Sequence, residues 1–330
     1  MQPASNQPTL SFIELLKRTF TIYRANFWTI IGLVAFVTIP ISLLNIIISP
    51  QPLAALTTTS VSDTPDFSGL LLDILGLIET IVISASLTYL ISEYLFGRKL
   101  TISQTFSEVS NRFAPVGCGV ILMGVVILIL AFFISFLLVA FPPALIFSGF
   151  LLHIIIAAYA LMFPVLTLEN IGASAAISRS WALGKRRFWA VFGIGLIAVL
   201  ISLLVTTILG SIVTLALSGV APNINLDLQF LIITIISDIV SIFVTPIAPI
   251  AFTLIYYNIR ATTEGLDDLL NTKVTPAQRP INFDSPAARF QFDSHDWRNI
   301  AILSVFGLIV GIIGNSLIQQ FIQQLAPGLK

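Results

Sequence analysis

The chain alternates between long apolar stretches and shorter polar segments. Seven of the stretches can cross a bilayer as helices, because a crossing takes about 20 residues. They lie near Phe27–Ile48, Gly69–Phe96, Phe113–Phe141, Ala144–Leu166, Phe188–Leu217, Leu228–Tyr257 and Asn299–Ile318. The paired prolines Pro142 and Pro143 separate the third stretch from the fourth, so we interpret these as two spans. Pro40, Pro246 and Pro249 lie inside spans, where we expect kinks or local unwinding. The pattern predicts an all-α integral membrane protein with seven transmembrane helices.

Composition supports this fold class. Of 330 residues, 56% are apolar and 10% are charged, whereas a soluble domain has about 45–50% and 25%. This balance excludes a cytosolic enzyme, a nucleic-acid-binding protein and a disordered chain. The single cysteine, Cys118, excludes an internal disulfide and argues against a cysteine-based metal site. We expect Cys118 to be a small packing residue within its span.

The placement of lysine and arginine predicts the orientation in the membrane. All but one of the 16 basic residues lie before the first span or in the loops after the second, fourth and sixth spans, and only Lys330 lies opposite. Basic loops face the cytoplasm. We therefore expect an inner-membrane protein with a cytoplasmic N-terminus and its C-terminus outside.

Three polar segments share one spacing of apolar residues, in steps of four, three and four. The sets are Leu16, Phe20, Tyr23 and Phe27; Ile102, Phe106, Val109 and Phe113; and Ile177, Trp181, Gly184 and Phe188. This spacing places each set on one helical face. It predicts three amphipathic interfacial helices that lie in the headgroup layer. The residues expected at headgroups and interface are Arg24, Trp28, Arg112, Arg186, Arg187, Trp189 and Arg260.

Each interfacial helix precedes two spans, which predicts a threefold internal repeat. The transmembrane domain would cover residues 1–260, with repeats near 10–96, 101–166 and 171–257. A cytoplasmic loop would follow at 261–298, and a single additional span at 299–318. The alternative is that the segments are unrelated, since amphipathic juxtamembrane segments are common in proteins with many spans.

Three polar residues stand out within the spans, because an ionisable side chain in hydrocarbon is costly. Glu79, His153 and Asp238 occupy corresponding positions of the three repeats, and they form our candidate intramembrane polar site. In the alternative interpretation each is satisfied separately by a neighbouring Ser or Thr. Nearer the inner surface, we expect three separate ion pairs: Glu93 with Arg98, Glu169 with Arg179, and Glu264 with Arg260.

Catalytic motifs are absent from the sequence. It contains no phosphate-binding loop, no nucleophile elbow and no His-Glu-x-x-His. Ser294, His295 and Asp296 are adjacent, but a triad requires spatial convergence, and we interpret this segment as a solvated loop. Gly307-x-x-x-Gly311 offers a small-residue face, for which we favour packing within the subunit over dimerisation. We expect no metal and no cofactor.

Motifs in three segments carry a family resemblance. They are Ser11–Trp28; Phe163–Trp189, which includes Glu169-Asn170 and Arg179-Ser180-Trp181; and Tyr256-Tyr257-Asn258-Ile259-Arg260 with Glu264-Gly265-Leu266-Asp267. Over residues 10–270 the chain resembles the membrane domain associated with bacterial glycerophosphoryl diester phosphodiesterases. Asn258 and Leu266 stand where that family has Asp and Phe. The resemblance implies a multi-span domain, sometimes joined to a phosphodiesterase and often found alone, to which the last span and its loop are an addition.

Together these features favour a non-enzymatic inner-membrane module. It would act as a scaffold or accessory protein in lipid or envelope metabolism, with membrane lipids and other membrane or envelope proteins as partners. The alternative is a transporter or permease for a small or lipid-like solute that uses the intramembrane polar site. An enzyme acting at the membrane ranks third.

Overall fold

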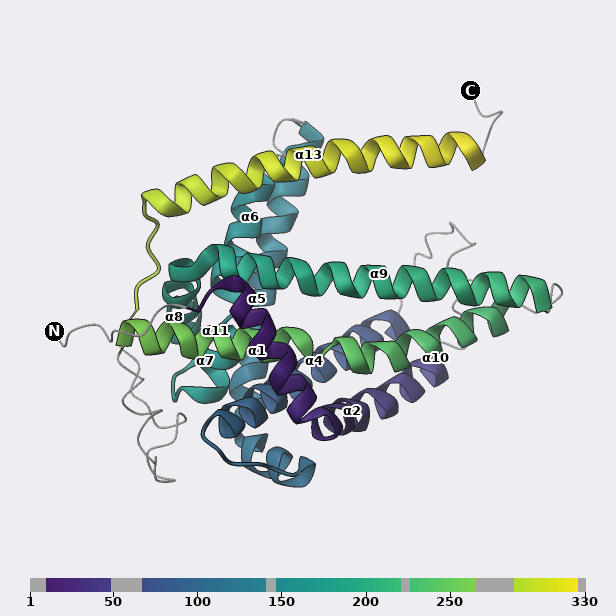
Figure 1. Ribbon diagram of the computed structural model, residues 1–330. Coiled ribbons are helices and arrows are strands. Elements are labelled where there is room, and N and C mark those ends of the chain that lie inside the picture. The colour runs from purple at the N-terminus through teal and green to yellow at the C-terminus, as the bar shows by residue number, and fades with distance from the viewer. Residues whose placement is uncertain (1–9, 49–66, 141–146, 221–225, 265–287, 326–330) are drawn as a thin grey trace.

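The computed structural model describes residues 10–48, 67–140, 147–220, 226–264 and 288–325, with side chains up to residue 309 in the last segment. These residues form helices joined by short turns (Figure 1). The elements are α1 (Phe12–Ala25), α2 (Phe27–Ile48), α4 (Phe67–Leu95), α5 (Ile102–Ala140), α6 (Ser148–Ile154), the π-helical turn η2 (Ile155–Tyr159), α7 (Met162–Leu168), α8 (Ala173–Gly184), the 3₁₀ turn η3 (Lys185–Arg187), α9 (Phe188–Val220), α10 (Leu226–Val244), α11 (Ile247–Glu264) and α13 (Ser294–Leu325).

Within the described residues, six helical segments are long and apolar enough to cross a membrane. They confirm an all-helical, multi-pass membrane protein. The observed α2 has the bounds expected for the first span, and α4 lies within two residues of the second. The seventh predicted span falls in α13, whose side chains are described only to residue 309. The count of seven and the threefold repeat therefore stay predictions.

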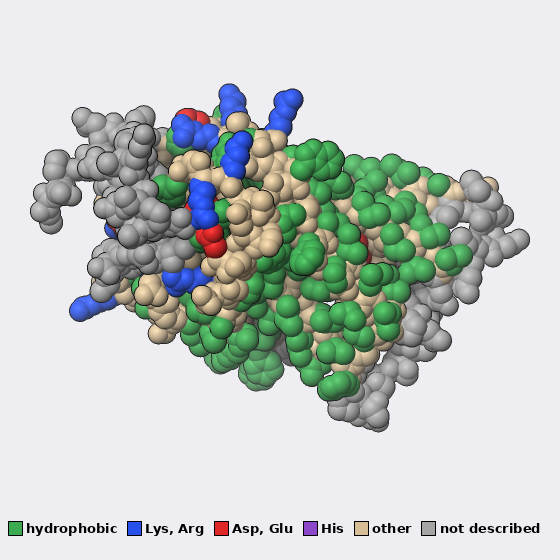
Figure 2. Space-filling view, turned by 90° about the horizontal axis from the view of Figure 1, so that it is seen from below, with side chains coloured by type: hydrophobic (Ala, Val, Ile, Leu, Met, Phe, Trp, Pro, Cys, Tyr) green, Lys and Arg blue, Asp and Glu red, His purple; other side chains and the backbone are tan. Residues whose placement is uncertain are grey.

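Charged and apolar side chains separate along the molecule. Figure 2 shows Lys and Arg side chains gathered at one end and hydrophobic side chains covering the rest of that face. In Figure 1, α9 and α13 run lengthwise between these two ends, and α1 crosses α11 obliquely. This arrangement is typical of a helix bundle whose charged end lies in water and whose apolar sides lie in lipid.

The first predicted interfacial helix is confirmed as a separate helix, α1. Ser11 caps its N-terminus by accepting a hydrogen bond from the Glu14 amide at 3.2 Å, and Asn26 ends it before α2. Its buried residues are Leu15, Thr19 and Ile22, and the helix packs against α11 and α2. They are offset from the expected stripe, and Phe20 is exposed.

The second predicted interfacial helix is not separate. Thr101 and Gln104 form a capping box, with reciprocal backbone-to-side-chain bonds of 3.0 and 3.3 Å, and α5 then continues from Ile102 through the whole span. Pro115 lies inside this helix without ending it. The expected boundary near Phe113, between an interfacial helix and a separate span, was therefore wrong.

The third predicted interfacial helix, α8, is separate from its span but faces protein rather than headgroups. Trp181 has no exposed surface, and its ring contacts His153, Phe290 and Phe292. A side chain at Gly184 would overlap the Ala157 carbonyl, so α8 and η2 are in close backbone contact. The aromatic face that we assigned to lipid is part of the core.

The prolines within spans have different effects. The sixth span divides into α10 and α11 at Thr245-Pro246, as expected, because proline cannot supply the amide that continues the helix. Pro40 lies within an uninterrupted α2. The fourth span widens into the π-helical turn η2 and has a two-residue turn at Ala160-Leu161 before α7, an irregularity that the sequence analysis did not predict.

The last helix packs on α6 through small residues. A side chain at Gly149 would overlap Ser304, and one at Gly307 would lie 2.7 Å from the Ser148 hydroxyl. The two helices therefore approach with little between them, as small residues permit in membranes. This confirms packing within the subunit for Gly307; Gly311 lies beyond the described side chains.

Candidate functional site

The family-like motifs come together in a buried ion-pair cluster, which comprises Glu169, Arg179, Tyr256, Arg260 and Glu264. Glu169 ends α7, Arg179 lies on α8, and the other three lie on α11. Arg179 pairs with Glu169 at 3.1 Å and with Glu264 at 2.6 Å, while Arg260 pairs with Glu264 at 2.8 Å and with Glu169 at 3.3 Å. Tyr256 donates to Glu169 at 2.8 Å.

The geometry makes this cluster a clamp. Glu169 has no exposed surface, and Arg179 and Arg260 are each 4% exposed. Two carboxylates and two guanidinium groups balance in charge, and buried charges persist only when they are paired in this way. Each carboxylate is shared between the two arginines. The cluster therefore fixes α7, α8 and α11 in one arrangement rather than offering a free acid or base.

A second charged group lies where α4 turns toward α5. Arg98 pairs with Glu93 at 3.2 Å and also with Glu108, and Tyr89 donates to Glu108 at 2.7 Å. The hydrogen bond to Glu108 raises the Arg98 pKa above its ordinary value, against the opposing effect of burial. The expected pairs of Glu93 with Arg98, Glu169 with Arg179, and Glu264 with Arg260 are all present.

The three residues of the predicted intramembrane polar site have separate surroundings. Glu79, half-buried on α4, accepts a 2.6 Å hydrogen bond from Thr38 of α2. His153 pairs with Asp296, and Asp238 is half-buried on α10. In the described part of the chain, no hydrogen bond or ion pair joins any two of the three. Thr80, the expected neighbour of Glu79, instead donates to the Gly76 carbonyl.

His153 belongs to a different polar group, which anchors the start of α13. Its Nε2 lies 3.1 Å from Asp296 Oδ1, and both side chains are buried. Phe188 stacks on the imidazole with ring centroids 4.6 Å apart. Our interpretation of Ser294-His295-Asp296 as a loop was wrong, because α13 begins at Ser294. Asp296 is not solvated either, since it is 1% exposed and accepts a hydrogen bond from the Asp293 amide. His295 is exposed.

The residues expected at lipid headgroups divide into two groups. Arg24, Trp28, Arg186 and Trp189 are exposed. The others make contacts within the protein: Arg112 reaches the Glu169 carbonyl and Asn170, Arg187 donates to Asn258 and to the Leu10 carbonyl, and Arg260 is buried in the ion-pair cluster. Arg260 was thus misplaced by sequence reasoning, which has no means of distinguishing an interfacial arginine from a buried one.

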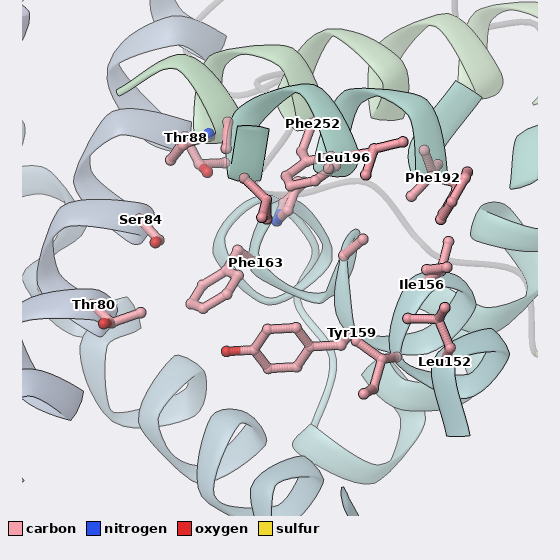
Figure 3. Close-up of a pocket in the computed structure, with 18 of the residues that line it drawn as sticks. Thr80, Ser84, Thr88, Leu152, Ile156, Tyr159, Phe163, Phe192, Leu196 and Phe252 are labelled. Carbon is pink, nitrogen blue, oxygen red and sulfur yellow. The ribbon is translucent and has the colours of Figure 1, made fainter. Parts of the chain in front are cut away.

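An apolar pocket of about 480 Å³ lies among the spanning helices, and we call it the lateral pocket. Its walls come from α4, α6, η2, α7, α9 and α11, with Phe306 of α13. Figure 3 shows Thr80, Ser84 and Thr88 on one side and the Tyr159 hydroxyl pointing toward that side. Val199 and Phe306 on its lining are exposed, so the pocket opens on the lipid-facing surface of the bundle.

The lateral pocket has few polar groups, and they differ in whether they have a hydrogen-bond partner. Thr80 bonds back to its own helix at 2.9 Å. Thr88 has no exposed surface, and its hydroxyl has no hydrogen-bond partner. An unpaired buried hydroxyl is costly unless a ligand or water satisfies it. Sequence analysis missed this site, although hydroxyl residues at every fourth position of α4 were a visible signal.

Metal and thiol chemistry find no support in the described residues. No group of three His, Cys, Asp or Glu side chains in the described ranges could hold a metal ion. Cys118 is exposed on α5, so it is not the packing residue that we expected.

Comparison with known proteins places these features in a family. The family model described as the membrane domain of glycerophosphoryl diester phosphodiesterase matches residues 142–311, just over half of the 330 residues. The match contains the ion-pair cluster and the His153–Asp296 pair, begins after the first three spans, and extends into α13, which the sequence analysis treats as an addition. No curated protein and no solved structure gives a significant match. The chain belongs to the glycerophosphoryl diester phosphodiesterase membrane-domain family.

Proposed function

We propose that this protein is a non-enzymatic inner-membrane module that holds a membrane lipid in its lateral pocket and serves as an accessory protein in lipid or envelope metabolism. The observation that carries the proposal is the pocket itself, which is apolar and opens sideways among the spanning helices. Its volume of about 480 Å³ lies in the range of small-molecule sites. The nearest molecules to such an opening are acyl chains.

The charged residues support a binding role over a catalytic one. In the ion-pair cluster every carboxylate is shared between two arginines. Such groups hold helices in place, and a general base would need a carboxylate or imidazole within reach of a substrate proton. The lateral pocket contains hydroxyl groups but no ionisable carboxylate or imidazole among its lining residues.

A pocket-filling substitution tests the proposal. Gly195 lines the pocket, and a Cβ there would make only ordinary contact, 3.9 Å from Phe252. We expect Gly195→Leu to place its larger side chain in the pocket and to reduce the phospholipid that stays bound after detergent purification, as counted by native mass spectrometry. Gly210→Leu is the matched control on the same helix, where a Cβ would meet nothing within 4 Å. Equal lipid retention by both variants would contradict lipid binding in this pocket.

One observation favours a transporter of a lipid-like solute as the second candidate. Thr80, Ser84 and Thr88 place hydroxyl groups at every turn along one wall of the pocket (Figure 3), and such a stripe can accompany a polar headgroup across the apolar layer. A lipid-scrambling assay in proteoliposomes tests it. Transport predicts faster exchange of a fluorescent phospholipid with wild-type protein than with Gly195→Leu, whereas a holding role predicts no acceleration over empty vesicles.

A further inference from the structure

A second cavity, which we call the basic pocket, lies where α9 and α13 begin. Its volume is about 550 Å³. Four basic residues line it, Lys185, Arg186, Arg187 and Arg298, against two acidic residues, Asp293 and Asp296. The pocket therefore has a net positive charge, which suits an anionic ligand.

The acidic residues form no ion pair with the arginines in the described part of the chain. Both pair with Lys185, Asp293 at 2.8 Å and Asp296 at 3.5 Å. The pairing with Lys185 lowers the pKa of Asp293 to about 2, so this contact is ionic at neutral pH. Arg187 donates to uncharged acceptors, the Asn258 amide and the Leu10 carbonyl, and keeps its positive charge.

Two arginines remain for a ligand. Arg186 and Arg298 are exposed, and no ion pair engages either of them within the part of the chain that the structure describes. Asn299 gives an independent indication. It lines the same pocket and is 4% exposed, yet its Oδ1 is buried without a hydrogen-bond partner. Oδ1 is an acceptor, so its missing partner is a donor such as a water or a headgroup hydroxyl, and not an ionised phosphate oxygen.

The basic pocket and the lateral pocket follow one another along the same two helices. On α9 the basic pocket is lined up to Ala190, and the lateral pocket begins at Val191. On α13 the order is the same, with Asn299 in the basic pocket and Phe306 in the lateral one. Seven helical residues separate these two, a rise of about 10 Å. Phe192 and Phe306 meet edge to face, with centroids 6.2 Å apart, between the helices.

Exposed tryptophans lie at the level of the basic pocket. Trp189, which lines the basic pocket, is 43% exposed, and Trp297, which directly precedes Arg298, is 58% exposed. Tryptophan gathers at the boundary between headgroups and acyl chains. A phosphate held by Arg186 and Arg298 would therefore sit at headgroup depth while the lateral pocket lies deeper.

We infer that the two pockets are two ends of one site for an anionic phospholipid, with the phosphate at Arg186 and Arg298 and an acyl chain in the lateral pocket. This inference rests on the proposed function and names the lipid class that it takes. The inference differs from a general attraction of basic residues to the membrane surface, because it assigns the preference for anionic lipid to Arg186 and Arg298 among the basic residues at the charged end of the molecule.

Photolabelling with matched lipids tests the inference. Wild-type protein in neutral vesicles receives a trace of phosphatidylglycerol or of phosphatidylcholine, each with a photoreactive group in the same acyl chain, and labelled α9 peptides are quantified. We expect phosphatidylglycerol to label more strongly. Since each lost cation weakens the attraction about five-fold, Arg186→Gln with Arg298→Gln should lower the preference at least ten-fold. Lys17→Gln with Arg24→Gln, which removes two exposed cations of α1, should leave most of it.

The outcomes separate the two proposals and the two sources of phosphate. Equal α9 labelling by both lipids would overturn the anionic site but leave lipid binding in the lateral pocket. Absence of α9 labelling by either lipid would overturn the proposed function as well. If inorganic phosphate protects Arg186 from chemical modification while the two lipids label equally, the pocket binds free phosphate and the phospholipid inference is wrong.

Discussion

Glu169 accepts hydrogen bonds from three side chains that come from two other helices. Arg179 reaches it from α8, and Tyr256 and Arg260 reach it from α11. Glu169 and Arg179 are close in sequence and lie at the same end of the spans, which was enough to predict that they pair. The crossed pairs, Arg179 with Glu264 and Arg260 with Glu169, required α8 and α11 each to pack against α7, which no local pattern encodes.

Removing the Glu169 carboxylate should destabilise the protein strongly. Glu169→Ala leaves Arg179 and Arg260 buried with one shared counter-charge, and breaking a buried pair costs about 3–5 kcal/mol. Glu14→Ala removes the exposed pair with Arg18, which is worth about 0–1 kcal/mol. The free energy of unfolding in detergent micelles checks both. Similar values for the two variants would show that the cluster does not clamp the helices.

Polar residues inside the spans were the hardest to interpret from the sequence. Their spacing indicated similar depth for Glu79, His153 and Asp238, but depth does not determine which neighbour each one faces. His153 finds its partner in Asp296, 143 residues later. That contact depends on where α13 packs. The sequence shows only that Ser, His and Asp are adjacent, and this pattern is equally compatible with a solvated loop.

At the scale of elements, hydropathy predicted well where the spans lie, but poorly whether each helix face contacts lipid or protein. Lipid tails and a protein core are equally apolar, so the pattern that predicts a buried face does not say what covers it. This is why the bounds of α2 agree with expectation while α8 was assigned to the headgroup layer. An apolar stripe such as Trp181 and Phe188 can face either lipid or protein. The contacts of these two rings with His153, and of Trp181 with Phe292, show that the stripe faces protein.

The contact of α13 with α6 should be sensitive to a single methyl group. Gly149→Ala introduces a Cβ that overlaps Ser304, and overpacking of this kind costs about 1–3 kcal/mol. We expect faster hydrogen–deuterium exchange in residues 294–309 as α13 separates. Gly76→Ala on α4 is the matched control, since its Cβ meets nothing within 4 Å and alanine favours helix by about 0.5–1 kcal/mol. Unchanged exchange in the Gly149 variant would contradict close packing.

At the scale of the whole molecule, the gathering of basic residues at one end (Figure 2) supports a single orientation in the membrane. We propose that this end faces the cytoplasm, with seven spans in three repeats and one addition. Fusions to a reporter active only outside the cytoplasm test this: those after Gln51, Pro222 and Lys330 should be active, and those after Thr101 and Lys273 silent. An inverted result at Lys330 alone would remove the span in α13.

The central claim is that a membrane lipid occupies the lateral pocket. The most direct measurement is an experimental structure of the wild-type protein in nanodiscs that contain phosphatidylglycerol. The account predicts elongated lipid density between α4, η2 and α9, passing within contact distance of Thr88, whose hydroxyl otherwise has no partner. Closure of the pocket by its own side chains, or density only on the outer surface of the bundle, would contradict the account.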